Sequence, residues 1–295
     1  TLPMEGADEI LIGASADDEG SSDDGTTELL PGELGQPRAV AHGGSRYRGA
    51  SSGAPWQVDA WPVRVSEKKN AWGTLQYPVD SPNQALQLAQ GGAGRLRNLA
   101  VDLATLEQLG APHAVDAPPN LVHLGPPGDL SSWRPWFRWL DAAAVVGPAG
   151  PLTWVPVPAR DQLTAAEVDA KLRRGSAVAG TGERLWLRVD GLHPGDAHLP
   201  IVDTASLAPT GPTADTGTAL TTPSAEPLLL TVDAITSGLD RVRILGDGGR
   251  VLYDAPEPPE AWAVPADAGR WVLALGTGPG EAWAVTGPIW IAPPR

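Results

Sequence analysis

Residues 163–191, LTAAEVDAKLRRGSAVAGTGERLWLRVDG, change from a helical to an extended pattern in the middle of the chain. Thr164 is a good helix N-cap, and Glu167 stands three residues later, as in a capping box. Basic residues precede Gly175, which predicts the end of the helix. The next residues alternate as in a β-strand, with Leu185, Leu187 and Val189 on one face. The stretch therefore predicts a junction between an α/β part and an all-β part.

The composition excludes several classes of function. The 295 residues carry a net charge of -14, whereas a nucleic-acid-binding surface or a surface for anionic lipid needs a basic footprint. No apolar run approaches the roughly 18 residues of a membrane span. Cysteine is absent, so disulfides, thiolate metal ligands and a cysteine nucleophile are excluded.

The pattern of elements on either side of this junction predicts two domains. Residues 1–182 contain three helical patterns (82–90, 102–109 and 133–140), and residues 120–124 and 152–158 suit strands. Residues 183–295 contain short strand patterns separated by Gly, Pro and Asp turns, which is typical of a β-sandwich. The polar stretch 203–226 is expected to be a mobile insertion in this second domain.

Tryptophan is concentrated in one of the expected helices. Trp133, Trp136, Phe137 and Leu140 fall at helical spacing and predict a core-facing stripe. Trp139 lies off this stripe, so the helix has apolar surface on more than one side. Tryptophan is enriched at protein contacts. We therefore expect Trp133, Trp136 and Trp139 to include a binding surface for another protein chain or an upstream precursor fragment.

Three segments resemble one enzyme superfamily. They are WRPWFRWLDAAAVVGPAG (133–150), the junction from LTAAEVDAK to LHPGD, and the C-terminal TGPIWIAPPR. Together they resemble the carbaryl-hydrolase-like branch of the PHP (polymerase and histidinol phosphatase) metallohydrolases. The resemblance implies a partial or degenerate distorted α/β barrel followed by a C-terminal β-sandwich. It also implies a metal centre with histidine and carboxylate ligands at strand ends.

The motifs that carry these ligands are replaced in this chain. Gly13, Ala14 and Ser15 stand where the family has its Asp-His motif, and Pro148, Ala149 and Gly150 stand where it has Asp-Ser-His. A further family histidine falls near Ala100, and the family's first HxH motif has no counterpart. Glu33 and His42 alone fall where metal ligands are expected, and they are candidate remnants of a metal site.

No other catalytic pattern is present in the sequence. The five histidines lack HxH and HExxH spacing, and GxSxG is absent. The sequence therefore predicts no catalytic residue, no bound metal and no cofactor. We expect a catalytically inactive PHP-like protein that serves as a structural or binding subunit in an extracytoplasmic location.

Two alternatives to this expectation stay open. The chain could be a metal-dependent hydrolase that an upstream fragment or a second chain completes. Alternatively, it could be a carbohydrate-binding β-sandwich that uses Trp262, Trp271 and Trp283.

Overall fold

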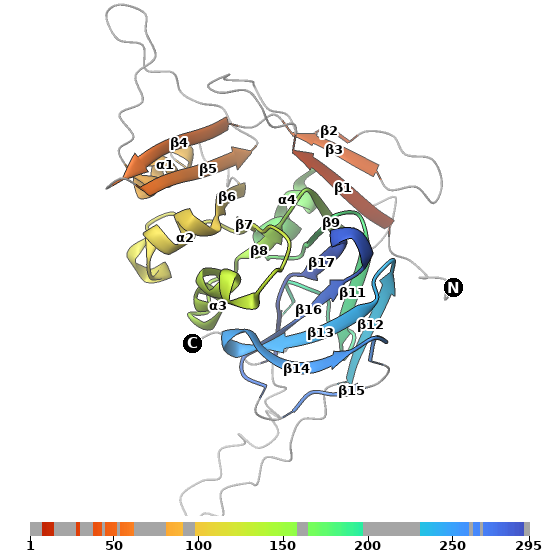
Figure 1. Ribbon diagram of the computed structural model, residues 1–295. Helices are drawn as coiled ribbons and strands as arrows, with labels where there is room; N and C mark the ends of the chain where they lie inside the picture. The colour runs from red at the N-terminus through yellow and green to blue at the C-terminus, as the bar shows by residue number, and fades with distance from the viewer. Residues whose placement is uncertain are drawn as a thin grey trace, which may run out of the picture.

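The computed structural model describes residues 8–14, 28–29, 38–42, 45–51, 54–61, 81–90, 98–157, 165–196, 231–259, 262–265 and 268–291. Their strands form three sheets (Figure 1). These sheets confirm the broad fold class that the sequence predicts, an α/β part combined with an all-β part. The sheets are open, and the described strands do not close into the barrel that the family resemblance implies. Among the described residues, no helix has the length and apolar character needed to cross a membrane.

The α/β part is built on a five-stranded sheet with the order β4-β5-β6-β7-β8. Its strands are β4 (Ser45–Ser51), β5 (Ala54–Trp61), β6 (Asn98–Asp102), β7 (Leu121–His123) and β8 (Gly147–Ala149). Strands β6, β7 and β8 run parallel to one another, while β4 and β5 are antiparallel neighbours. The helices are α1 (Pro82–Gln90), α2 (Leu103–Leu109) and α3 (Arg134–Asp141), and they confirm the three helical patterns in the sequence.

The two faces of this sheet are covered by different helices. Side chains from one face, including Leu99, Val101 and Val122, share a core with α1, α2 and α3. Residues of the opposite face, Ala100, Leu121 and Ala149, pack with helix α4 (Ala165–Arg173). Helix α4 is the helix expected from residues 163–191, and Gly175 follows it with φ +72°. The N-cap expected at Thr164 lies outside the described residues.

Strand β8 follows α3 and lies close to the turn after α4. Gly147–Ala149 form a buried strand paired with β7. A Cβ on Gly147 would lie 2.7 Å from the Cα of Gly175. Glycine is required here for the approach of two backbones, and a sequence pattern does not reveal such an approach.

The remaining strands form a ten-stranded sheet and a three-stranded sheet. The larger has the order β14-β13-β16-β17-β10-β9-β1-β3-β2, with β18 paired to β16. Its strands are β1 (Asp8–Ala14), β2 (Glu28–Leu29), β3 (Arg38–His42), β9 (Leu152–Val157), β10 (Val178–Gly180), β13 (Arg241–Gly246), β14 (Arg250–Ala255), β16 (Trp271–Thr277), β17 (Trp283–Thr286) and β18 (Ile289–Trp290). The smaller sheet contains β11 (Arg184–Val189), β12 (Thr231–Ser237) and β15 (Trp262–Ala263).

The two sheets share an apolar core. Leu185, Leu187 and Val189 of β11 pack with Ile244 and Val272 of the larger sheet. The expected domain boundary after residue 182 falls between β10 and β11. Strand β10 belongs to the larger sheet, where β17 from beyond that boundary pairs with it. Residues on the two sides of the boundary therefore share one sheet.

A second apolar core joins the α/β part to the C-terminal strands. The ring centroids of Trp133 and Trp283 lie 6.0 Å apart, and Phe137 stacks on Trp271 at 5.9 Å. Helix α3 thus lies between the five-stranded sheet and the C-terminal strands (Figure 1), and its aromatic side chains contact both.

Candidate functional site

A polar cluster forms where the parallel strands of the five-stranded sheet end. Asp102 is the last residue of β6 and His123 is the last residue of β7, and the two are register partners. Ligand sites of open α/β sheets form at the carboxyl ends of parallel strands. This edge is therefore the part of the described fold where chemistry is expected first.

The neighbouring strand β5 adds a carboxylate to this edge. The Asp59 Oδ2 atom lies 2.8 Å from His123 Nε2 and accepts a hydrogen bond from Gln57 Nε2 at 3.0 Å. The side chain of Asp59 is 11% exposed and that of His123 is 28% exposed. The carboxylate is thus fixed inside the fold, while part of the imidazole reaches the surface.

The chemistry of Asp59 assigns the hydrogen positions on His123. An ionised carboxylate only accepts hydrogen bonds, so Nε2 of the ring carries a hydrogen. In the neutral ring, Nδ1 then keeps the lone pair. Such a carboxylate–imidazole pair can hold the Nδ1 atom in position to accept a hydrogen bond or a proton from a ligand.

The start of α2 holds this cluster in place. Asp102 is the N-cap of the helix, and its Oδ1 accepts a hydrogen bond from the backbone N–H of Thr105 at 2.7 Å. The Thr105 hydroxyl oxygen accepts a hydrogen bond from the Gln57 backbone N–H at 2.8 Å. Strand β5, strand β6 and helix α2 are therefore locked together beside Asp59 and His123.

The next strand end adds no ligand to the cluster. Ala149 is the last residue of β8 and the register partner of His123. Ala149 and Ala100 are buried in one apolar cluster with Val168 and Leu172 of α4. Within the described part of the chain, no three His, Asp or Glu side chains come together in a way that could hold a metal ion.

The metal-site candidates from the sequence are placed only in part. Glu33 lies outside the described residues. His42 is the last residue of β3, and its backbone is the register partner of Ala14 at the end of β1. The backbone therefore brings His42 beside the position where the family has its Asp-His motif.

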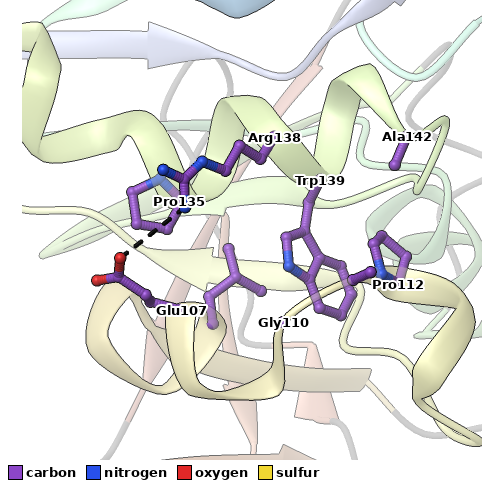
Figure 2. A pocket seen from close by; sticks show the side chains of 9 residues that line it. Glu107, Gly110, Pro112, Pro135, Arg138, Trp139 and Ala142 are labelled. Atoms are coloured by element: carbon purple, nitrogen blue, oxygen red, sulfur yellow. Dashed lines mark ion pairs between the residues drawn. The ribbon is translucent and has the colours of Figure 1, made fainter.

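The tryptophan prediction needs a correction for Trp139. Trp133, Trp136 and Trp139 are 1%, 0% and 1% exposed, so all three belong to the interior. The core-facing stripe is confirmed, but a partner chain cannot contact a Trp139 ring that the chain itself covers. The second side of α3 is covered by α2, which packs against it (Figure 2).

Among the described residues, Val251 is the one exposed large hydrophobic side chain, at 44%.

Four residues of the polar cluster are missed by the sequence patterns: Gln57, Asp59, Asp102 and His123. Asp102 carries a usable signal, since it follows an apolar run and precedes a helix in a β–α–β pattern, whereas His123 lies inside the apolar run 120–124. Asp59 carries none, because nothing local indicates that β5 pairs with β6.

In comparisons with known proteins, no family model, no curated sequence and no solved structure matches this chain.

Proposed function

We propose that this chain is a catalytically inactive, PHP-like protein that serves as a structural or binding subunit. The observation that carries the proposal is the burial of Ala100 and Ala149 beneath α4. The family resemblance places ligand motifs at these two positions. In this fold they are apolar contacts of Val168 and Leu172, with 0% and 4% of the two alanines exposed.

The physical reason lies in what a metal centre requires. Metals that activate water need several polar ligands converging on one point, with a coordination position left open. A helix packed on the sheet face fills that space with methyl groups instead. A partial or degenerate form of the PHP barrel, followed by a C-terminal β-sandwich, belongs to this same proposal, as do an extracytoplasmic location and a partner chain.

A metal titration with a hydrolysis assay tests the proposal. We expect the full chain, supplied with Mn²⁺ or Zn²⁺, to hydrolyse p-nitrophenyl phosphate and its diester no faster than the metal alone. Metal-dependent hydrolysis that disappears in His123→Ala and persists in His113→Ala would overturn it. His113 is a suitable control because it lies in the turn after α2, away from the strand ends.

The Asp59–His123 pair favours a second candidate, a metal-dependent hydrolase completed by another polypeptide. The pair places one imidazole and one carboxylate at the carboxyl edge of the sheet. Copurification of a second chain that restores hydrolysis to the protein, but not to His123→Ala, would favour this candidate over the first.

Support for a carbohydrate-binding function is reduced to one aromatic residue. Trp271 and Trp283 are 0% and 1% exposed, so neither can stack on a sugar. Trp262 is partly exposed and contacts Tyr253, with ring centroids 5.6 Å apart.

A further inference from the structure

Residues 193–196, HPGD, form a tight turn shortly after β11. The Asp196 backbone N–H donates a hydrogen bond to the His193 carbonyl oxygen at 2.9 Å. Gly195 has φ +86°, as the third residue of a type II turn does when proline precedes it. The Asp196 Oδ2 atom also accepts a hydrogen bond from the His193 backbone N–H at 2.9 Å. The first and last residues of the turn are therefore joined by two hydrogen bonds.

This turn is fixed to two other segments of the chain. The Gly195 N–H donates a hydrogen bond to the Pro288 carbonyl oxygen at 2.8 Å, and the Trp290 N–H donates one to the Asp196 carbonyl oxygen at 3.0 Å. A Cβ on Gly195 would lie 2.7 Å from the carbonyl oxygen of Arg174, which follows α4. The turn therefore joins the end of α4 to the segment that contains β18.

The imidazole of His193 is partly buried at this junction. Its Nδ1 atom is buried and has no hydrogen-bond partner among the described residues. In the neutral ring with its hydrogen on Nε2, Nδ1 carries only a lone pair. Protonation of the ring would place an N–H at Nδ1, where the described fold offers no acceptor. A buried donor without an acceptor is unfavourable, so this geometry favours the neutral ring.

The charges around His193 also oppose its protonation. Burial lowers the pKa of the imidazole below its ordinary value of 6.5, and the positive charge of Arg188 in β11 lowers it further. To a smaller extent, Asp196 raises this pKa and Lys171 of α4 lowers it. Residues 288–290 contain no charged side chain. Two of the elements that meet at the turn therefore present a positive charge to the ring.

We propose that residues 193–196 form an acid-sensitive latch, which opens when His193 takes up a proton. In the open state the turn leaves the end of α4 and the segment 288–290, and the charged ring reaches water. The closed state binds this proton more weakly than the open state does. Its stability is therefore fully present above the ordinary pKa of 6.5 and is lost as the pH falls through the lower pKa of the closed state. This inference is independent of the proposed function, because it concerns different residues and needs no hydrolysis.

Amide hydrogen exchange of the full chain at about pH 7.5 and about pH 5.5 tests the latch. The reporters are the amides of Gly195 and Trp290, because their hydrogen bonds join the latch to the segment 288–290. After correction for the intrinsic rates, we expect both to exchange about fivefold faster at the lower pH. The Ala274 amide, which donates to Thr286 Oγ1 at 2.9 Å in the larger sheet, should keep its protection. Unchanged reporters, or an equal loss of protection at Ala274, would overturn the proposal.

Histidine variants assign the acid response to one side chain. His193→Gln removes the titrating group and should abolish the difference between the two pH values. His113→Gln, in the turn after α2, and His198→Gln, outside the described residues, should keep the difference. Asp169 cannot cause the opening, because its raised pKa favours the folded state as the pH falls. A response that survives His193→Gln, or one that disappears in His198→Gln, would overturn the assignment.

A titration of the imidazole resonances by NMR keeps the test decisive if His193→Gln itself opens the turn. The His193 resonance is identified by its loss in this variant, and its pKa in the unmodified protein should lie below 6.5. Arg188→Gln removes an opposing charge, so the pKa should rise and the acid response should fall to about threefold. Arg184→Gln removes the same charge from the other end of β11 and should change neither. A His193 pKa of 6.5 or higher, or equal effects of the two arginine variants, would overturn the proposal.

Discussion

Asp141, the last residue of α3, accepts a hydrogen bond from the indole N–H of Trp271 in β16 through its Oδ1 atom at 3.0 Å. The same oxygen accepts a hydrogen bond from the backbone N–H of Gly248 at 3.0 Å. Arg270 adds a hydrogen bond from its guanidinium to the Asp141 carbonyl oxygen at 3.1 Å. One side chain thus joins the helical layer to two neighbouring parts of the C-terminal sheet.

Removing this carboxylate should destabilise the whole protein. Asp141→Ala leaves two N–H groups without their acceptor, and we expect a loss of about 2–4 kcal/mol in the free energy of unfolding. Asp141→Asn keeps an acceptor oxygen and should cost less. Urea denaturation of both variants checks this, and an Asp141→Ala midpoint equal to the wild-type midpoint would contradict it.

Substitutions at two adjacent glycines distinguish the cost of backbone strain from the cost of a packing clash. Gly248 and Gly249 have φ +68° and +76°, so alanine is strained at both positions and should cost about 1 kcal/mol. A Cβ on Gly249 would also lie 2.4 Å from the Phe137 ring, whereas a Cβ on Gly248 meets only Asp141 Oδ2 at 4.0 Å. We expect Gly249→Ala to cost about 2 kcal/mol more than Gly248→Ala by thermal denaturation. Equal costs would mean that α3 moves aside freely.

The hydrogen-bonded pair at the candidate site should show energetic coupling. Asp59→Ala removes the acceptor of both Gln57 and His123, and we expect it to destabilise the protein more than His123→Ala does. A double-mutant cycle should give a coupling energy of about 1 kcal/mol. Additive effects of the two substitutions would show that the Asp59–His123 contact contributes nothing to stability.

Asp169 of α4 should make stability depend on pH. Burial raises the pKa of this carboxyl, while Arg173 and the hydrogen bond from Asn98 Nδ2 at 2.8 Å lower it to a smaller extent. The folded protein thus holds this proton more tightly than the unfolded chain. The stabilising effect of the raised pKa is complete below the ordinary value of 3.8 and is lost as the pH rises through the folded pKa.

Asp169→Asn removes this titration and keeps an acceptor for Asn98. We expect it to stabilise the protein at pH 7 by less than about 1 kcal/mol, since the carboxyl is partly solvated. The difference between variant and wild type should shrink as the pH falls toward 4. Denaturation at a series of pH values measures it, and a gain that is constant across the series would contradict the assignment to Asp169.

Local patterns predicted the helices and most C-terminal strands well. Helix α1 has the predicted bounds 82–90, and Gly175 follows α4 as expected. The glycine-rich stretch LGDGGR (245–250) is typical of a hairpin turn, and it joins β13 to β14. These elements are determined by residues near them in the sequence, through capping, periodicity and turn chemistry.

The contacts between distant segments could not be predicted in this way. Trp139 looked available to a partner because its spacing on α3 shows which side it occupies, but not that α2 packs there. Asp59 has no local signal, because its contact with His123 depends on β5 pairing with β6. The spacing of residues within one element does not encode which other element will pack against it.

The contact between Trp133 and Trp283 has a consequence for how the protein folds during synthesis. Helix α3 leaves the ribosome long before β16 and β17. Until those strands arrive, Trp133 lacks its contact with Trp283, and Phe137 lacks its contact with Trp271. The nascent chain therefore carries an uncovered aromatic surface from the synthesis of α3 until that of β16 and β17, and exposed apolar surface of this kind favours chaperone binding and aggregation.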